Sequence, residues 1–596
     1  MITPQQRAKE NKRSKVRLYS IIAVLGLFLS MQILRAYLIG DGTLISTNEI
    51  FSQNLNSFNI FFIPNDVKYL ELIVIALFIY GIAIMLVLTD DTVSLPKHQQ
   101  KGSSEFADVK ISYKYREKEQ TDNVIFTDNV QISMDSEKTG LNNNSLIIGA
   151  SQCGKTHRYI SPNLLNIGKE NIVVNDVKGE ILIMHGKHLI EKGYDLRVLN
   201  TKNMKKSLRF NPLAYIRKES DILSIAKMLS EALGDKGNSG NDQFWKSAKE
   251  NLIITCISYV WERKENYPEE FNLPHINDLL RMSEEKILPN GTVIKSEFDK
   301  IFEAYSIAHP TSLCSRSYGN FKMNRDKTRS NVLTTLSSML SCLDIEEARQ
   351  LLGGEDELHI EELATKEKIA IFLCSSDTDS TWNFIITLAI TLGLNKVSDI
   401  RDENPEVGVP VVFWLDEFAN GCRIKDCDKI VSVCSSRRIA MKIIVQSITQ
   451  LEKLYKDEWK IIIENCATTL VLGAVGDSAT YVSKRLGDQS LDVKPTSETK
   501  QLKGGSSTIN HNVDKRELLT ANEVERLKDD AIIMIRGEQP IIDHKYRTQQ
   551  DPRFKLMGYV KKGHNCERNF FFEPELYRKN KNKCENKGNK EKEEVA

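Results

Sequence analysis

The feature that most constrains the fold of this 596-residue chain is a glycine-rich segment from Gly149 to Thr156. It has the spacing G-x-x-x-x-G-K-T, follows the apolar run that begins at Ser145, and precedes residues 157–165, which we expect to be helical. Glycines let backbone N–H groups surround a phosphate, and the N-terminus of the following helix adds a positive dipole. The pattern therefore predicts a strand, a phosphate-binding loop and a helix at the start of an α/β domain.

Each loop residue has an expected role. Gly149, Cys153 and Gly154 would line the phosphate site, and Lys155 would contact the terminal phosphates of ATP and act in catalysis. The hydroxyl of Thr156 would be a ligand of Mg²⁺.

A pair of acids, Asp416 and Glu417, follows the apolar run from Val409 to Leu415. Such a run is typical of a buried parallel strand. We expect Asp416 to hold Mg²⁺ together with Thr156, and Glu417 to orient and deprotonate the attacking water. The alternative is that the two acids are only the solvated end of a strand.

Gln446 ends another apolar run, which begins at Met441. Since the carboxyl ends of parallel strands form the ligand crevice of such sheets, Gln446 would sense the γ-phosphate as a catalytic residue, or else cap its strand. Arg437 and Arg438, just before this strand, are candidates for an arginine finger that reaches a neighbouring subunit's site. Their alternative is a solvated basic turn.

Two long apolar runs, 18–39 and 69–88, predict a transmembrane hairpin, because about 20 such residues cross a bilayer as a helix. Six basic residues precede the first run, whereas residues 40–67 contain no Lys or Arg. The positive-inside rule then places both the N- and C-termini in the cytoplasm. The alternative for the first run is a cleaved signal peptide.

Composition and periodicity complete the domain prediction. Eleven scattered Cys without a Cys-x-x-Cys argue against a zinc ribbon, and a net charge of +1 argues against a uniformly basic surface.

Helical spacing dominates after Pro212, and strand patterns resume at Ile369. We therefore expect a basic cytoplasmic N-terminus at 1–17, the transmembrane hairpin at 18–88, a linker and the start of the nucleotide-binding domain at 89–144, the first part of that domain at 145–215, an inserted all-α domain at 216–367, the second part of the nucleotide-binding domain at 368–547 and a polar, disordered tail at 548–596.

The residues from about Ser145 to Lys545 resemble the TraG-like coupling proteins of type IV secretion and bacterial conjugation. The similarity rests on five segments, which are Ile172–Ile181, Phe210–Leu213, Leu415–Phe418, Gln446–Leu451 with Trp459 and Asn465–Cys466, and Arg516–Gly537. The phosphate loop differs from many relatives at residues 151–153, where those proteins are richer in glycine or small residues.

This resemblance implies a RecA-like P-loop NTPase domain of α/β class with an inserted all-α domain and an N-terminal two-helix transmembrane hairpin. Such a protein is a multi-pass ATPase of the bacterial cell membrane with ATP and Mg²⁺ as cofactors. It would form a homo-hexamer, receive single-stranded DNA bound to a relaxase, or a protein substrate, and deliver it to the components of a type IV secretion channel.

Two alternatives stay open. A double-stranded DNA translocase of the chromosome-partition type shares the fold, although the tail after Arg547 is too short and polar for the DNA-reading domain that such proteins carry. A membrane scaffold that binds nucleotide without hydrolysing it is the other alternative, and Glu417 argues against it.

Overall fold

The computed structural model describes residues 101–233, 242–284, 286–287, 293–324, 326–421, 423–493, 512–559 and 566–583, with helix α2 (Leu44–Asn56) and residues 32, 33, 35–37, 39 and 78. The expected spans at 18–39 and 69–88 lie almost entirely outside these residues, as does the basic N-terminus at 1–17. Within the described part of the chain, no helix has both the length and the apolar character needed to cross a bilayer.

The centre of the fold is a nine-stranded sheet with the order β15-β14-β11-β3-β10-β9-β4-β8-β5. Seven strands from β11 to β5 are parallel, whereas β14 is antiparallel to β11 and β15 to β14. The strands are β3 (Ser145–Gly149), β4 (Asn171–Asp176), β5 (Asp195–Asn200), β8 (Ile369–Cys374), β9 (Val411–Leu415), β10 (Ile439–Val445), β11 (Thr468–Gly473), β14 (Asp530–Ile535) and β15 (Ile541–His544).

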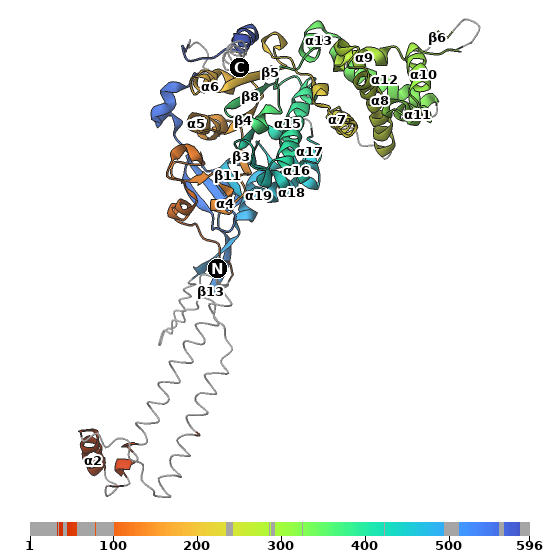
Figure 1. Ribbon diagram of the computed structural model, residues 1–596. Helices are drawn as coiled ribbons and strands as arrows, with labels where there is room; N and C mark the ends of the chain where they lie inside the picture. Colours follow the sequence, from red (N-terminus) through yellow and green to blue (C-terminus); the bar gives the residue numbers. More distant parts are fainter. Residues whose placement is uncertain are drawn as a thin grey trace, which may run out of the picture. The chain divides into compact units, whose positions relative to one another are not determined.

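Helices cover both faces of this sheet (Figure 1). Side chains alternate along a strand, so Leu146 and Ile148 enter one hydrophobic core and Ile147 enters the other. The Ile147 face is covered by α5 (Ser161–Asn166) and α6 (Glu180–Glu191), and the opposite face by α15 (Asn383–Glu403), α16 (Cys427–Val433), α17 (Ile448–Tyr455), α18 (Glu458–Glu464) and α19 (Asp477–Leu486). The predicted α/β class with a largely parallel sheet is confirmed.

Residues between β5 and β8 form the expected helical insertion. It contains α7 (Glu219–Ala232), α8 (Asp242–Glu262), α9 (Leu273–Arg281), α10 (Glu297–Ala308), α11 (Leu313–Lys322), α12 (Asp326–Leu340), α13 (Glu346–Leu352) and α14 (Glu362–Thr365). The prediction of an all-α unit needs one correction, because β6 (Lys286–Ile287) and β7 (Val293–Ile294) pair as a short antiparallel ribbon.

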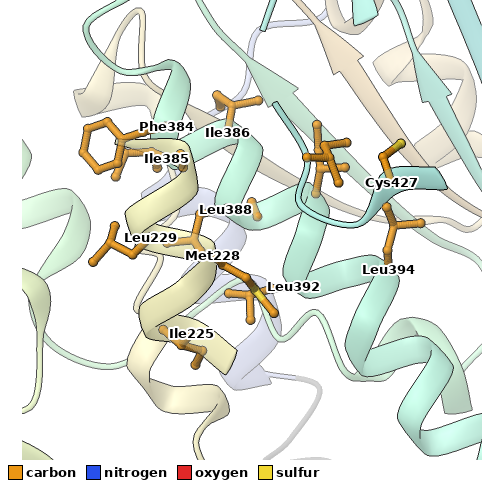
Figure 2. Close-up of a cluster of buried hydrophobic side chains, with 14 of the residues drawn as sticks. Ile225, Met228, Leu229, Phe384, Ile385, Ile386, Leu388, Leu392, Leu394 and Cys427 are labelled. Carbon is orange, nitrogen blue, oxygen red and sulfur yellow. The ribbon is translucent and has the colours of Figure 1, made fainter. Parts of the chain in front are cut away.

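The core of the insertion continues into the core beneath the sheet. Figure 2 shows Ile225, Met228 and Leu229 of α7 close to apolar side chains of α15, among them Leu388 and Leu392. The three α7 residues follow the i, i+3, i+4 spacing that places side chains on one helix face. The insertion therefore shares a hydrophobic core with the sheet instead of having its own.

A separate small unit is built from β12 (Asp488–Val493) and β13 (Asn512–Glu517), which pair antiparallel, and from residues 101–104. Ser103 forms a β-bridge with Gln489, and Lys515 pairs with Asp488 at 2.9 Å. Part of the segment predicted as the closing strand region, Arg516 and Glu517, therefore belongs to this ribbon.

The prediction of a disordered tail at 548–596 is wrong for residues 548–559 and 566–583. Two short helical turns, η12 (Thr548–Gln550) and η13 (Pro552–Leu556), are followed by a helix at 574–583. Phe572 is buried, the Phe570 ring lies against Gly186 of α6, and Arg578 pairs with Glu357 at 2.6 Å. The low average apolar content predicted disorder, but a few aromatic side chains are enough to pack this segment against the domain.

Candidate functional site

The glycine-rich segment forms a tight loop between β3 and a helix that begins at Thr156. A Cβ atom on Gly149 would lie 2.6 Å from the Cys153 sulfur, so a side chain there collides with the loop itself. Gly154 has φ +92°, a conformation that favours glycine. Gln152 takes a left-handed φ of 63° without being glycine.

The helix after the loop begins as a π-helical turn, η5 (Thr156–Ile160), and continues as α5 with Pro162 near its start. A proline inside a helix has no N–H for the preceding turn and crowds the carbonyl there. The wider turn accommodates Pro162, and wide turns of this kind are frequent at functional sites.

Lys155 and Glu417 meet at the carboxyl edge of the sheet. The Nζ atom of Lys155 lies 3.8 Å from Oε1 of Glu417 and donates a hydrogen bond of 3.0 Å to the carbonyl of Gly149. The strand order brings them together, because β10 separates β3 from β9 and all three run parallel. The predicted convergence of the loop with the acid pair is confirmed.

The carboxylate of Glu417 is held from both sides. Gln446 donates from Nε2 to Oε1, and Asn420 donates from Nδ2 to Oε2. Glu417 itself has a left-handed φ of 54°, and strained backbone of this kind clusters at functional sites. The sequence prediction missed Asn420, although a polar residue three positions after Glu417 is close enough to return to it through a single 3₁₀ turn, η10 (Phe418–Asn420).

Asp416 is half-buried. Burial, with a smaller contribution from the neighbouring Glu417 charge, raises the pKa of Asp416 to about 7. Asn175, near the end of β4, donates to the Asp416 carbonyl at 2.7 Å, while its own Oδ1 is buried and has no hydrogen-bond partner among the described residues. Asn175 and Asp416 line the same cleft, and an unsatisfied amide oxygen and a carboxylate are chemically suited to a hard cation or to the water around it.

The acids and the loop open into a cleft of about 600 Å³. Its walls include Lys155, Thr156, Asp416, Glu417 and Gln446. Thus the predicted catalytic and Mg²⁺-binding side chains share one cavity. Gly149, Cys153 and Gly154 shape the loop itself.

Two further segments line the cleft. One is the end of β4 with the turn that follows it. Asp176, the last residue of β4, accepts a hydrogen bond from the Leu182 amide at 2.8 Å, and burial raises its pKa to about 6. The other is the loop 375–380 after β8, which sequence reasoning missed. Lys178, in the turn after β4, pairs with Asp377 of that loop at 3.7 Å.

Comparison with known proteins decides the family. A model of the family described as "Type IV secretory system Conjugative DNA transfer" matches residues 103–568. The chain belongs to this family of type IV secretion coupling proteins.

Several members of the coupling-protein family are similar to the chain. Protein VirD4 of Agrobacterium fabrum is 22% identical over 432 residues, which cover 68% of this chain and 59% of that protein. The conjugal transfer protein TraG of Rhizobium radiobacter is 22% identical over 391 residues, 62% of this chain and 56% of that one. The chain thus spans less than two thirds of the length of these relatives.

Solved structures of the bacterial conjugative coupling protein TrwB have a similar fold. One unbound form gives a TM-score of 0.56 at 15% identity and covers 76% of this chain and 94% of that one. Another, solved in complex with ADP and Mg²⁺, gives a TM-score of 0.55 at 14% identity and covers 76% and 96%. These likenesses support the RecA-like fold expected for a coupling protein.

In this coupling protein, Arg437 and Arg438 lie at the amino end of β10, the end away from Gln446 and the cleft. Arg437 pairs with Asp402 at 2.8 Å, and Arg438 pairs with Glu406 at 3.1 Å. The structure therefore does not bring either arginine to the chain's own cleft.

Proposed function

We propose that this protein is an ATPase of the bacterial cell membrane that moves single-stranded DNA bound to a relaxase, or a protein substrate, to a type IV secretion channel. The observation that carries the proposal is the meeting of Lys155 and Glu417, 3.8 Å apart, in a cleft of a coupling-protein fold. A cation on the loop beside a carboxylate that follows another strand of the same sheet is an arrangement suited to phosphoryl transfer to water.

ATP and Mg²⁺ are the proposed cofactors. TrwB structures in complex with ADP and Mg²⁺ and with a non-hydrolysable ATP analogue support this choice. Thr156 and Asp416 would hold the metal, which would neutralise charge on the phosphate oxygens. Among the described residues no cluster of three His, Cys, Asp or Glu side chains could hold a metal. Mg²⁺ does not need such a cluster, because it usually takes one or two protein ligands and completes its shell with water and phosphate oxygens.

In the proposed reaction Glu417 accepts a proton, and two neighbouring amides orient its carboxylate. Water would attack the γ-phosphorus, its proton would pass to a carboxylate oxygen of Glu417, and the bond from phosphorus to the β–γ bridging oxygen would break. Gln446 and Asn420 fix the direction of that carboxylate. Lys155 would exchange its hydrogen bond to the Gly149 carbonyl for the phosphate oxygens.

We also propose where the protein is located and how its subunits assemble. The apolar runs 18–39 and 69–88 would form a hairpin with both termini in the cytoplasm. The subunits would form a homo-hexamer with ATP between neighbours, since a closed ring is one outcome of a head-to-tail interface. In such a ring Arg437 or Arg438 would have to leave its acidic partner to serve as an arginine finger.

The test is ATP hydrolysis by the detergent-purified full chain with and without single-stranded DNA, together with DNA transfer between cells. Lys155→Ala and Glu417→Gln should each lower turnover at least 100-fold and abolish transfer, because they remove the phosphate contact and the base. Lys300→Ala, at an exposed ion pair within α10, is the matched control and should change neither. Full hydrolysis by Glu417→Gln would contradict the assignment, and stimulation by double-stranded DNA alone would favour the double-stranded DNA translocase.

A further inference from the structure

The segment that follows Glu417, residues 418–421 and 423–426, leads from β9 to α16. Phe418, Asn420 and Ile424 of this segment line the cleft. Asn420 is also the residue that holds one oxygen of the Glu417 carboxylate. The position of the segment therefore affects the direction of the carboxylate assigned as the base.

Tyr455, the last residue of α17, anchors the segment near both of its ends. The Phe418 ring stacks on the Tyr455 ring, with centroids 5.5 Å apart and an angle of 5° between the planes. The Ile424 amide donates a hydrogen bond of 3.2 Å to the Tyr455 hydroxyl. Because Tyr455 is only 1% exposed, its ring is a fixed point of the closely packed domain core. Contacts made between these two anchors then decide how the rest of the segment is turned.

Arg423 lies between the anchors and reaches the helical insertion. Its Nη1 atom donates a hydrogen bond of 3.3 Å to Glu231 near the end of α7, and its Nη2 atom donates to Glu458 at the start of α18. The guanidinium carbon lies 6.0 Å from the centroid of the Tyr455 ring, which is within the range of a cation–π contact. One planar cation thus joins the insertion and the domain to the segment after Glu417.

The carboxylate of Glu231 is partly enclosed and has two cationic partners. The Glu231 side chain is 13% exposed and accepts hydrogen bonds from Lys246 of α8 and from Arg423. Salt screens partly buried ion pairs less than exposed ones, so this contact retains more of its strength in solution. A continuous series of contacts therefore leads from α8 through α7 to the segment that holds Glu417.

We propose that Arg423 is a positioning residue through which the helical insertion controls ATP hydrolysis, with single-stranded DNA as the cargo that moves the insertion. The inference rests on the proposed function, which assigns Glu417 as the base and this DNA as the cargo. A displacement of α7 moves the Glu231 carboxylate and changes its hold on Arg423, while Glu458 stays with the domain. The segment then turns, and Asn420 redirects the Glu417 carboxylate relative to the attacking water.

The experiment measures steady-state ATP hydrolysis by the detergent-purified full chain, with and without a single-stranded oligonucleotide. Arg423→Gln removes the charge that joins the two carboxylates. It should lower kcat about ten-fold and change the KM for ATP less than about three-fold, because it misdirects the base without touching the nucleotide. Arg423→Lys should lose less than about three-fold in kcat, since an ammonium still pairs with one carboxylate.

Glu231→Ala removes the contact with the insertion, keeps the helix and leaves Glu458 in place. It should keep kcat without DNA within about two-fold, whereas stimulation by the oligonucleotide, expected to be about five-fold or more, should fall below about 1.5-fold. Arg423→Gln should lose the stimulation as well, and the double variant should lose no more than Arg423→Gln alone, because both changes act on one contact. The matched control is Arg217→Gln, which removes an ion pair with Glu361 just before α7 and should change neither kcat nor stimulation.

Undiminished stimulation in Glu231→Ala and Arg423→Gln would overturn the inference and leave the proposed function intact. A rise in KM that accounts for the whole loss in Arg423→Gln would overturn it too, since the residue would then act in binding. Turnover of the unmodified chain that DNA does not change has the same meaning. An unmodified chain that hydrolyses no ATP would instead overturn the proposed function. If Arg423→Gln fails to fold, the stimulation measured in Glu231→Ala decides.

Discussion

Gln446, the residue after β10, donates a hydrogen bond to the carboxylate of Glu417, which ends the turn after the neighbouring strand β9. This contact orients the group assigned as the base without neutralising it. Gln446→Ala should therefore lower kcat about 100-fold while changing KM less than three-fold, because ground-state binding of the nucleotide does not depend on the contact. Steady-state ATPase kinetics measure both constants, and an equal change in KM would show that Gln446 acts mainly in binding.

Asn420 holds the other carboxylate oxygen from an exposed position. Asn420→Ala should lower kcat about ten-fold, less than Gln446→Ala, because water can replace an exposed donor. The double variant should lose less than the sum of the two separate losses, since both act on one carboxylate. Strict additivity of the two effects in log kcat would indicate that they act independently.

The phosphate loop contains two residues with left-handed φ angles, which predicts opposite responses. Gly154→Ala should destabilise the protein by more than about 1 kcal/mol, because φ is +92° and the added carbon meets Arg158. Gln152→Gly should be neutral or slightly stabilising, since relief of strain at φ 63° offsets the greater freedom of the unfolded chain. Urea unfolding distinguishes the two, and equal destabilisation by both would contradict the strain argument.

His185 on α6 makes stability sensitive to acid. The residue is fully buried, its Nε2 lies 2.9 Å from the Ser161 hydroxyl, and burial lowers its pKa from 6.5 to about 3. The neutral ring is favoured in the fold, so this contribution is present above pH 6.5 and is lost as the pH falls toward 3. Between pH 7 and pH 5 the free energy of unfolding should fall by about 2 kcal/mol through this group.

His185→Gln should make that part of the pH dependence disappear in urea unfolding measured at several pH values. His309→Gln, at an exposed histidine, should leave the pH dependence unchanged. An unaltered slope in the His185 variant would show that another group is responsible.

Gly186 of α6 allows the C-terminal segment to pack. A Cβ on Gly186 would lie 2.2 Å from the Phe570 ring, so Gly186→Ala should displace this segment and speed its proteolysis about ten-fold. The matched control is Gly319→Ala in α11, where a Cβ would meet nothing within 4 Å. That change should stabilise by about 0.5–1 kcal/mol through helix propensity. Unchanged proteolysis in the Gly186 variant would mean that the segment does not depend on this contact.

Local patterns predicted which segments meet at the cleft. The loop from Gly149 to Thr156 and the acids after β9 were recognisable because each joins a buried strand to residues of specific chemistry. Parallel strands share a carboxyl edge, so their convergence followed once the sheet was assumed.

Other parts depended on contacts that no local pattern contains. Asn420 is an ordinary polar turn residue until its backbone turn directs it to Glu417. Phe570 and Phe572 lie in a polar stretch whose average composition predicted disorder.

The shared core of α7 and α15 has a mechanical consequence. Asn383, the first residue of α15, borders the cleft, and farther along the same helix Leu388 and Leu392 pack with α7 (Figure 2). A pull on the insertion would act on α15 as on a stiff lever, because separating the two helices would expose their apolar sides to water. Force on the insertion would then change the cleft through α15, and changes in the cleft would in turn move the insertion.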